Sequence, residues 1–303
     1  MKKEFLITEA EDGIILRSFL KERLRVSTRL LTSLKKKEDG ILLNGERVTV
    51  RVLLRAGDRL TISVADTEEA VNPHLTPVPL SVPILYEDED VVVCAKPAGM
   101  PTHPSHGHRE DTLANALAYR YRHRPFVFRA IGRLDRETGG ALAVAKNPHS
   151  GALLSHAMQE GKIKKEYVAW VEGIPPKEGR IAAPIRRKEG TVMLREVCGV
   201  GEGDEAETLF RLLYTNGCQS LIHLFLPTGR THQIRVHMAS VGHPLVGDGL
   251  YGHGREGERT LLHALRLTLP LPSTGEETCF FAAPDEDFPF PVPPPPVWSE
   301  KPL

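Results

Sequence analysis

The sequence predicts an α+β fold with a small N-terminal unit and a larger second domain. Strand-like and helix-like patterns are mixed along the chain without the regular alternation of a doubly wound α/β protein. A proline-rich stretch separates two segments that each contain both kinds of pattern. The length of 303 residues allows one large domain and a small one, and 41% hydrophobic with 26% charged residues is typical of a globular protein.

The N-terminal unit, residues 1–64, is predicted to contain two short helices and several strands. Apolar residues recur at helical spacing at Leu16, Phe19, Leu20 and Leu24. A second helix is expected to begin at Ser27 or Thr28, because either side chain can cap it. Asn44-Gly45 is a strong hairpin signal. The strands around it are expected at residues 41–43, 48–52 and 60–64.

Residues 65–83 are predicted to be a linker, because they contain four prolines and no clear period. Prolines favour an extended, semi-rigid spacer. The second domain is therefore expected to span residues 84–303. Its end, with prolines at 289, 291 and 293–296, cannot form a regular element and is expected to be an extended or disordered tail.

Within the second domain, apolar runs predict strands at residues 90–95, 141–145, 165–171 and 220–226. One helix is expected after Asp111 or Thr112, and another over residues 231–241. A further helix is predicted after Asn147-Pro148, a typical N-cap and first-turn pair, and should end at Gly161.

Basic residues are concentrated in the N-terminal unit, although the formal net charge of the chain is zero. Residues 1–64 carry a net charge of +5, and residues 21–37 hold seven basic residues against Glu22 alone. Such a cluster suits contact with phosphates, and it is also typical of a solvated helix face. The candidate phosphate contacts are Arg25, Arg29, Lys35, Lys36 and Lys37.

Other features indicate a cytoplasmic protein without a membrane segment. The four cysteines are far apart and form no CxxC pair, which predicts neither a disulfide framework nor a zinc cluster. The N-terminus becomes acidic at Glu4, before the apolar core of a signal peptide could form. No apolar run reaches the roughly 18 residues that a membrane span needs.

The most informative stretch runs from Gly132 to Gly140 and places Asp135 between Arg133 and Arg136. Guanidinium groups beside a carboxylate favour its ionised form. An ionised carboxylate among arginines suits a phosphate-bearing substrate and nucleophilic chemistry. A surface ion-pair loop would show the same pattern, so other motifs must decide between the two interpretations.

Three more segments carry candidate chemistry: Lys96–Pro104, Lys164–Tyr167, and Leu226–Met238 continued by Gly242–Gly252. With the Asp135 stretch, and in this order, they resemble the RluA-type branch of the pseudouridine synthases over most of the chain. The run Gly-Arg-Thr-His-Gln-Ile-Arg-Val-His, followed by Gly-His-Pro-Leu-Val-Gly-Asp, is the most specific part. The N-terminal unit is also similar to the small S-four-like RNA-binding domain of a ribosomal protein.

The resemblance implies a catalytic domain on a mixed, mainly antiparallel sheet with flanking helices, preceded by a small α+β RNA-binding domain. It implies that a uridine in RNA is detached at nitrogen 1, rotated and rejoined through carbon 5. No cofactor or metal is expected; three histidines between 103 and 108 lack a carboxylate or cysteine partner at metal-binding spacing. Ribosomal RNA is the expected substrate and transfer RNA stays open. The protein is expected to be a monomer without an obligate protein partner.

The resemblance also implies residue roles. Asp135 matches the essential aspartate, acting as nucleophile or as electrostatic stabiliser of a ribosyl intermediate. Arg235 matches the arginine that pairs with it, and Arg230 is a competing candidate and a possible phosphate contact. Tyr167 matches the tyrosine that stacks on the base and helps remove the carbon 5 proton. Arg133 matches the residue that fills the space left by the flipped base.

Two departures from the family pattern lie close to Asp135. Gly132 stands where the family usually has His, and Gly139 where it usually has Ser, which puts the hydrogen bonding around this loop in question. Lys96 is expected to be scaffold at the rim of the site, and His232 with Gln233 to form part of the pocket wall.

Two alternatives to the synthase remain. A non-catalytic RNA-binding or ribosome-assembly protein on a synthase scaffold is disfavoured by the intact set of Asp135, Tyr167 and Arg235. A hydrolytic nuclease would need a metal and a second carboxylate near Asp135, and only Glu137 is close in sequence.

Overall fold

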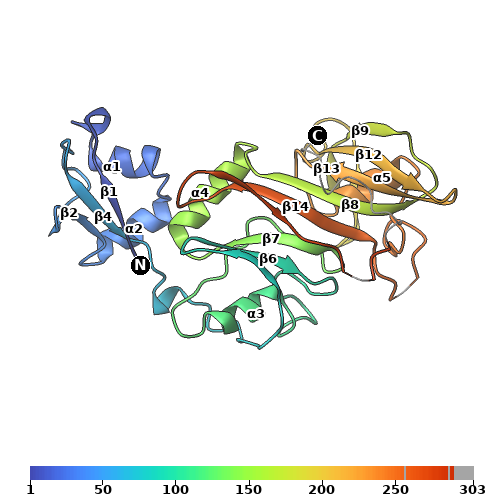
Figure 1. Ribbon diagram of the computed structural model, residues 1–303, viewed down its shortest axis with the longest axis horizontal. Helices are drawn as coiled ribbons and strands as arrows, with labels where there is room; N and C mark the ends of the chain where they lie inside the picture. Colours follow the sequence, from blue (N-terminus) through green and yellow to red (C-terminus); the bar gives the residue numbers. More distant parts are fainter. Residues whose placement is uncertain (256, 286, 290–303) are drawn as a thin grey trace.

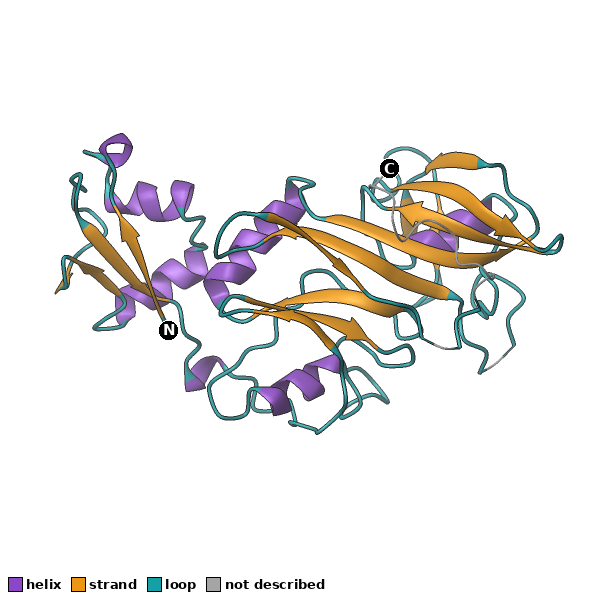
Figure 2. Ribbon diagram, in the orientation of Figure 1, coloured by secondary structure: helices purple, strands orange, loops and turns teal. Residues whose placement is uncertain are grey.

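The computed structural model describes residues 1–255, 257–285 and 287–289. It shows a small N-terminal sheet with helices at one end of a long second sheet (Figure 1). The second unit has more strand than helix, and helices lie along its faces (Figure 2). Among the described helices, none combines the length and apolar composition needed to cross a membrane. The proline-rich tail predicted beyond residue 289 lies outside the described residues.

The N-terminal unit is a four-stranded antiparallel sheet in the order β1-β4-β2-β3. Its strands are β1 (Lys2–Leu6), β2 (Ile41–Leu43), β3 (Glu46–Arg47) and β4 (Arg59–Ser63). Its helical elements are η1 (Glu9–Glu11), α1 (Leu16–Ser18), η2 (Phe19–Arg23) and α2 (Thr28–Lys36). The Ser27 side chain accepts a hydrogen bond from the Leu30 backbone, so Ser27 caps α2 as the sequence predicts. Apolar residues of α1, η2 and α2 pack together with the sheet as one core.

The strand predicted at residues 48–52 is wrong. After the Asn44-Gly45 turn only Glu46 and Arg47 pair with β2, and the chain then forms turns. The carbonyl oxygens of Val50 and Val52 accept hydrogen bonds from the backbone at the start of α1 instead of from a strand. Val48, Val50 and Val52 still pack against the core. An extended chain can place alternate side chains inward without a hydrogen-bonded neighbouring strand.

The segment 65–83 contains one short helix, η3 (Glu68–Ala70), and is otherwise irregular. Asp66, at the start of this segment, forms hydrogen bonds with the second unit. The Arg129 guanidinium donates hydrogen bonds to both Asp66 carboxylate oxygens, and the Val127 backbone donates to the same carboxylate. The Asp66 side chain is almost fully buried by these contacts.

The second unit contains a nine-stranded sheet in the order β5-β6-β7-β14-β8-β13-β12-β9, with β15 also paired to β14. Every pairing is antiparallel except that of β7 with β14, which confirms the mixed, mainly antiparallel sheet. The strands are β5 (Ile84–Glu87), β6 (Val91–Lys96), β7 (Gly139–Ala145), β8 (Lys164–Glu172), β9 (Glu178–Ala182), β12 (Glu207–Thr215), β13 (Gln219–Phe225), β14 (Leu262–Pro270) and β15 (Glu277–Phe281). A separate hairpin is formed by β10 (Ile185–Arg187) and β11 (Arg195–Val197).

Three helices flank this sheet: α3 (Leu113–Arg120), α4 (Pro148–Gln159) and α5 (Gln233–Ser240). Alternate residues of β6 and β7 enter two different cores, so the two faces of the sheet are both covered. Leu113 and Leu117 of α3 belong to one core, and Leu154 and Ala157 of α4 to the other. The predicted Thr112 and Asn147 caps are both present.

The parallel pairing of β7 with β14 depends on Gly140. Its φ is +115°, and a β-carbon there would lie 2.1 Å from the Ala264 carbonyl oxygen. Only glycine permits this close approach, which brings the start of β7 against the start of β14. The loop before β7 is thereby fixed next to the centre of the sheet.

Candidate active site

Residues 132–138 form the loop that enters β7, and neighbouring segments hold it on both sides. The Thr102 hydroxyl donates to the Leu134 carbonyl oxygen at 2.9 Å. The buried Lys96 ammonium group donates to the carbonyl oxygens of Pro97, Met100 and Arg136 at 2.9, 2.6 and 3.2 Å. The Lys96–Pro104 segment and the Asp135 loop are therefore bound together, which fixes the backbone that carries Asp135.

Asp135 lies in a hollow where distant parts of the chain meet. Seven residues that the sequence assigns to the pocket or its wall line it: Arg133, Asp135, Tyr167, Arg230, His232, Gln233 and Arg235. The loop before β7, strand β8, the loop between β13 and α5, and the start of α5 supply them. A short apolar wall of Leu134, Leu226, Ile234 and Leu262 completes the hollow. The arrangement offers a carboxylate, a phenol and three guanidinium groups to one anionic, partly aromatic substrate.

Arg235 is shared between two carboxylates. One of its nitrogens lies 3.6 Å from Asp135 Oδ2. Its Nε and a terminal nitrogen each donate to Asp248, at 2.7 Å, in a two-bond arrangement. Arg235 thus approaches Asp135 as expected, but its strongest partner is a residue for which the sequence gave no role. Asp248 belongs to the motif segment Gly242–Gly252, so the signal was present without an assignment.

The Asp248 carboxylate is fully buried and fully bonded. Besides the two Arg235 bonds it accepts hydrogen bonds from the backbones of Leu250 and Tyr251, at 2.9 and 3.1 Å. Burial by itself would raise the pKa of Asp248, but the Arg235 hydrogen bonds and charge outweigh it and hold the pKa below its usual range. Asp248 therefore stays ionised and keeps Arg235 in place.

Tyr167 lies on β8 with its side chain almost completely buried. Burial, with the negative charge of Asp135 as a second cause, raises the pKa of the Tyr167 phenol well above its usual range. The phenol is therefore protonated at neutral pH. Its ring forms one wall of the hollow that Asp135 faces.

Arg230 and Arg133 have separate places at the rim. The Arg230 Nε donates to the Glu205 carbonyl oxygen at 2.9 Å, so Arg230 is directed to a backbone group, whereas Arg235 approaches Asp135. Arg133 is exposed and lines both the Asp135 hollow and a neighbouring one that contains Lys165. Both arginines are exposed at the surface beside the pocket.

Two neighbouring residues, His232 and Tyr251, complete the site. His232 Nε2 lies 3.8 Å from Asp135 Oδ2, and its Nδ1 lies 2.8 Å from the Tyr251 hydroxyl. The Tyr251 ring also lies under the Arg235 guanidinium, with 5.2 Å between the guanidinium carbon and the ring centroid. The sequence placed His232 in the pocket wall and gave Tyr251 no role.

The two glycine departures have structural counterparts. Gly132 has a φ of +84°, and a β-carbon there would lie 3.1 Å from Lys165 Nζ. A β-carbon on Gly139 would lie 3.3 Å from Nδ1 of the buried His263. Lys165 and His263 thus occupy the space where the family's usual side chains would project.

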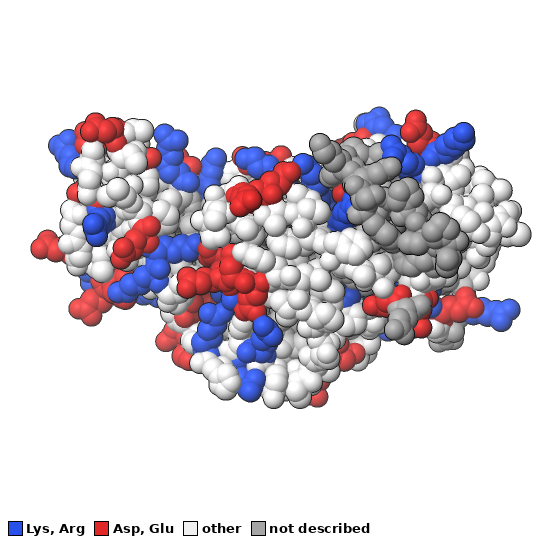
Figure 3. Space-filling view, in the orientation of Figure 1, with Lys and Arg blue, Asp and Glu red and all other residues white. Residues whose placement is uncertain are grey.

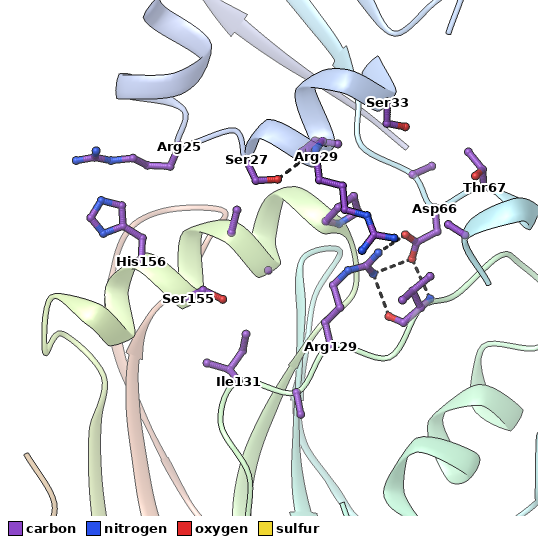
Figure 4. Close-up of a pocket in the computed structure, with 18 of the residues that line it drawn as sticks. Arg25, Ser27, Arg29, Ser33, Asp66, Thr67, Arg129, Ile131, Ser155 and His156 are labelled. Carbon is purple, nitrogen blue, oxygen red and sulfur yellow. Dashed lines mark hydrogen bonds and ion pairs between the residues drawn. The ribbon is translucent and has the colours of Figure 1, made fainter. Parts of the chain in front are cut away.

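A second hollow lies between the N-terminal unit and α4, with a volume of about 650 Å³. Figure 4 shows Arg25 and His156 across its mouth and the Arg29 side chain extending into it. Lys37 also lines it, and Arg29 lines a further open hollow on the outer face of α2 with Lys36. Lys35 is exposed on α2. Basic and acidic side chains are interspersed over the N-terminal unit on the face seen in Figure 3.

Comparisons with known proteins agree with this geometry. Residues 90–240 match the RNA pseudouridylate synthase family. The chain is 38% identical to the uncharacterized RNA pseudouridine synthase YjbO of Bacillus subtilis, over 87% of this chain and 93% of that protein. It is 35% identical to the ribosomal large subunit pseudouridine synthase D of Haemophilus influenzae, over 82% of this chain and 81% of that protein.

A solved structure, the human RNA pseudouridylate synthase domain containing 1, covers 68% of this chain and 84% of its own, with 31% identity and a TM-score of 0.55. The sheet, the motif segments that meet at Asp135 and these relatives point to the same conclusion. The chain belongs to the RNA pseudouridylate synthase family, in its RluA-type branch.

Proposed function

We propose that this protein isomerises specific uridines of ribosomal RNA to pseudouridine, with Asp135 as the essential catalytic group. The observation that carries the proposal is the convergence of Asp135, Tyr167 and Arg235 on one hollow from three separate segments. The substrate class is supported by relatives named for the ribosomal large subunit. Transfer RNA is the second possible substrate, and the same site chemistry would serve it.

The reaction is an internal rearrangement. The bond between nitrogen 1 and the ribose carbon 1′ breaks, and the bond between carbon 5 and carbon 1′ forms. The carbon 5 hydrogen leaves as a proton and nitrogen 1 takes up a proton, so the product is an isomer of uridine. Asp135 acts on the ribose, either as a nucleophile or by stabilising the positive charge that develops on the sugar. Arg235 approaches this carboxylate and would orient it. These residues supply the chemistry without a cofactor.

The target nucleotide must leave its stack to reach Asp135, at a cost of a few kcal/mol that is smaller in a loop. We assign Arg133 to the space that the base leaves, because its exposed guanidinium lies at the rim of the hollow. Tyr167 would stack on the extracted base. Its oxygen can take up the carbon 5 proton only after the phenol has lost its own proton, which the raised pKa of Tyr167 disfavours.

We assign residues 1–64 to an S-four-like RNA-binding domain, 65–83 to a linker and 84–303 to the catalytic domain. Three neighbouring pockets extend from the N-terminal domain to Asp135 in the catalytic domain. The cavity beside α4 shares Ile131 with the hollow that contains Lys165, and that hollow shares Arg133 and Tyr167 with the Asp135 hollow. We infer that the RNA backbone follows these pockets to the basic residues of the N-terminal unit, Arg25, Arg29, Lys35, Lys36 and Lys37. The protein would work as a cytoplasmic monomer.

The experiment that tests this function is tritium release from RNA labelled at carbon 5 of uridine. Ribosomal RNA transcripts without modifications are the substrate, and Asp135→Asn is the matched control because it removes the charge and little volume. Release by the wild type alone supports the proposal. Binding of RNA without release, by both proteins and on all transcripts, would indicate the non-catalytic RNA-binding protein instead.

A further inference from the structure

His232 has an unusual backbone at the edge of the site. Its φ is +57° and its ψ is +20°, a left-handed conformation that costs free energy in a residue with a side chain. It lies directly before α5, and it is the reason the helix predicted from residue 231 begins only at Gln233. Strained residues of this kind cluster at functional sites, and the conformation directs the His232 ring between Tyr251 and Asp135.

The hydrogen bonds of Tyr251 indicate which nitrogen of the His232 ring carries the hydrogen. The Tyr251 oxygen accepts a hydrogen bond from the Arg195 backbone at 2.9 Å and lies 2.8 Å from His232 Nδ1. Its single hydroxyl hydrogen is satisfied if it is donated to Nδ1, which must then be unprotonated. A neutral imidazole with a bare Nδ1 carries its hydrogen on Nε2, and Nε2 is the atom that faces Asp135.

The ring is neutral for a separate reason. Burial lowers the pKa of His232, and the charges of Arg235 and Arg195 act in the same direction, against those of Asp135 and Asp248. Tyr251 also contacts the ring at Nδ1, and Arg133 and Arg230 line the same pocket. A neutral ring can donate from Nε2 without bringing a further full positive charge to Asp135.

The two donors meet at the same carboxylate oxygen. Arg235 lies 3.6 Å and His232 Nε2 lies 3.8 Å from Asp135 Oδ2. Both separations exceed a hydrogen bond, and contacts of this kind often shorten only when substrate binds. Oδ2 is therefore the Asp135 oxygen that both donors approach.

We propose that His232 is a positioning residue for the Asp135 carboxylate and that Tyr251 holds its ring with the hydrogen on Nε2. This inference rests on the proposed function for its consequence in catalysis. The placement of the imidazole hydrogen is a property of the free protein and can be measured without RNA.

The first test is nuclear magnetic resonance of the imidazole nitrogens in the full chain at neutral pH, with His232→Asn identifying the His232 signals. An unprotonated Nδ1 and a protonated Nε2 are expected. Tyr251→Phe removes the hydrogen bond that favours the neutral ring, so the pKa of His232 should rise in that variant. A protonated Nδ1 in the wild type, or an unchanged His232 pKa in Tyr251→Phe, would overturn the assignment.

The second test compares two substitutions at His232 by tritium release. Asn tolerates the left-handed backbone and presents an oxygen near the Nδ1 position, but has no donor at the Nε2 position. Gln presents an amide nitrogen near that position. The kcat of His232→Asn should fall about 100-fold with KM within about threefold, and His232→Gln should keep activity to within about tenfold.

Equal losses in the two variants, or a change confined to KM, would contradict a positioning role. Urea unfolding of both variants verifies that each is folded at the assay temperature. Wild-type protein that releases no tritium would contradict the proposed function, whereas the imidazole measurement would still decide whether Nε2 presents a hydrogen to Asp135.

Discussion

Arg235 donates two hydrogen bonds of 2.7 Å to Asp248. Its distance to Asp135 is longer, at 3.6 Å. Asp248 therefore fixes the orientation of the guanidinium, and Arg235 offers its remaining nitrogen to Asp135. The buried Arg235–Asp248 pair holds the guanidinium in one position, because both ions are desolvated and each supplies the hydrogen-bonding partner that the other has lost from water.

Asp248→Asn should reduce both stability and activity. The substitution leaves the buried Arg235 charge without its carboxylate, a change that typically costs about 3–5 kcal/mol. Urea unfolding measures the stability, and tritium release measures kcat in the folded fraction. Asp39→Asn, which removes an exposed carboxylate paired with Lys2, is the control and should change neither. A folded Asp248→Asn enzyme with wild-type stability would show that the pair does not hold the site together.

The buried His263 predicts a loss of stability in acid. Its Nε2 donates to the Ala282 carbonyl oxygen at 2.9 Å, while its Nδ1 is buried without a hydrogen-bond partner in the part of the chain that the structure describes. Burial lowers the pKa of His263 to about 4. The unfolded chain, with a pKa near 6.5, binds more protons between these values. Stability should therefore be complete above about pH 6.5 and fall by up to about 3 kcal/mol toward pH 4.

His263→Gln isolates this contribution, because Gln keeps a donor for Ala282 but does not titrate. The free energy of unfolding of each protein is measured at pH 7 and pH 5. The wild type should lose more stability than His263→Gln over this range, whereas a substitution of the exposed His74 should leave the wild-type loss unchanged. Parallel pH curves for wild type and His263→Gln would contradict the prediction.

Position 139 offers a comparison of two small substitutions. A β-carbon there would lie 3.2 Å from both the Ala98 nitrogen and the Lys96 oxygen, so Gly139→Ala should cost about 1 kcal/mol by crowding. Gly139→Ser, which restores the family's usual residue, adds a hydroxyl that can donate to the unpartnered His263 Nδ1. Ser should therefore be better tolerated than Ala in urea unfolding. If Ser is the worse of the two, the hydroxyl does not reach His263.

The basic residues of α2, including Arg29 at the cavity of Figure 4, should set the salt dependence of RNA binding. Arg29→Gln and Lys36→Gln should each weaken binding and reduce the slope of log K against log salt by about 0.7 to 0.9, because one phosphate contact is lost. Fluorescence titration across salt concentrations measures this slope. Arg55→Gln, on the same unit but paired with Asp12, is the control and should keep the slope. Equal slopes for all proteins would remove the N-terminal unit from the RNA path.

Point substitutions are a cleaner test than deletion of residues 1–64, because the two units are bonded to each other. Lys3 pairs with the buried Asp90 at 2.6 Å, and His149 Nε2 lies 2.9 Å from the Leu24 carbonyl oxygen. Deletion would leave Asp90 without its lysine and would destabilise the catalytic unit. A loss of RNA binding in the truncated protein would then have two causes.

Local chemistry made several elements predictable. The caps at Ser27, Thr112 and Asn147 and the turn at Asn44-Gly45 depend on side chains within three residues of the groups they bond, so the sequence identifies them directly. The strand expected at residues 48–52 failed for the opposite reason. Its valines have the right period, but the partners of its backbone groups lie in α1, more than 30 residues earlier in the chain.

The sequence by itself determined the α+β class, the family and the residue types of the site, because motif order and local spacing carry that information. Only the tertiary structure decided which partners those residues bind through hydrogen bonds and ion pairs. Arg235 donates hydrogen bonds to Asp248, and Arg230 donates one to the Glu205 carbonyl oxygen. His232, with its left-handed backbone, lies beside Asp135. These interactions join segments up to 100 residues apart in the chain. Their energies depend on burial and on distance, and both are fixed only when the chain folds and excludes water.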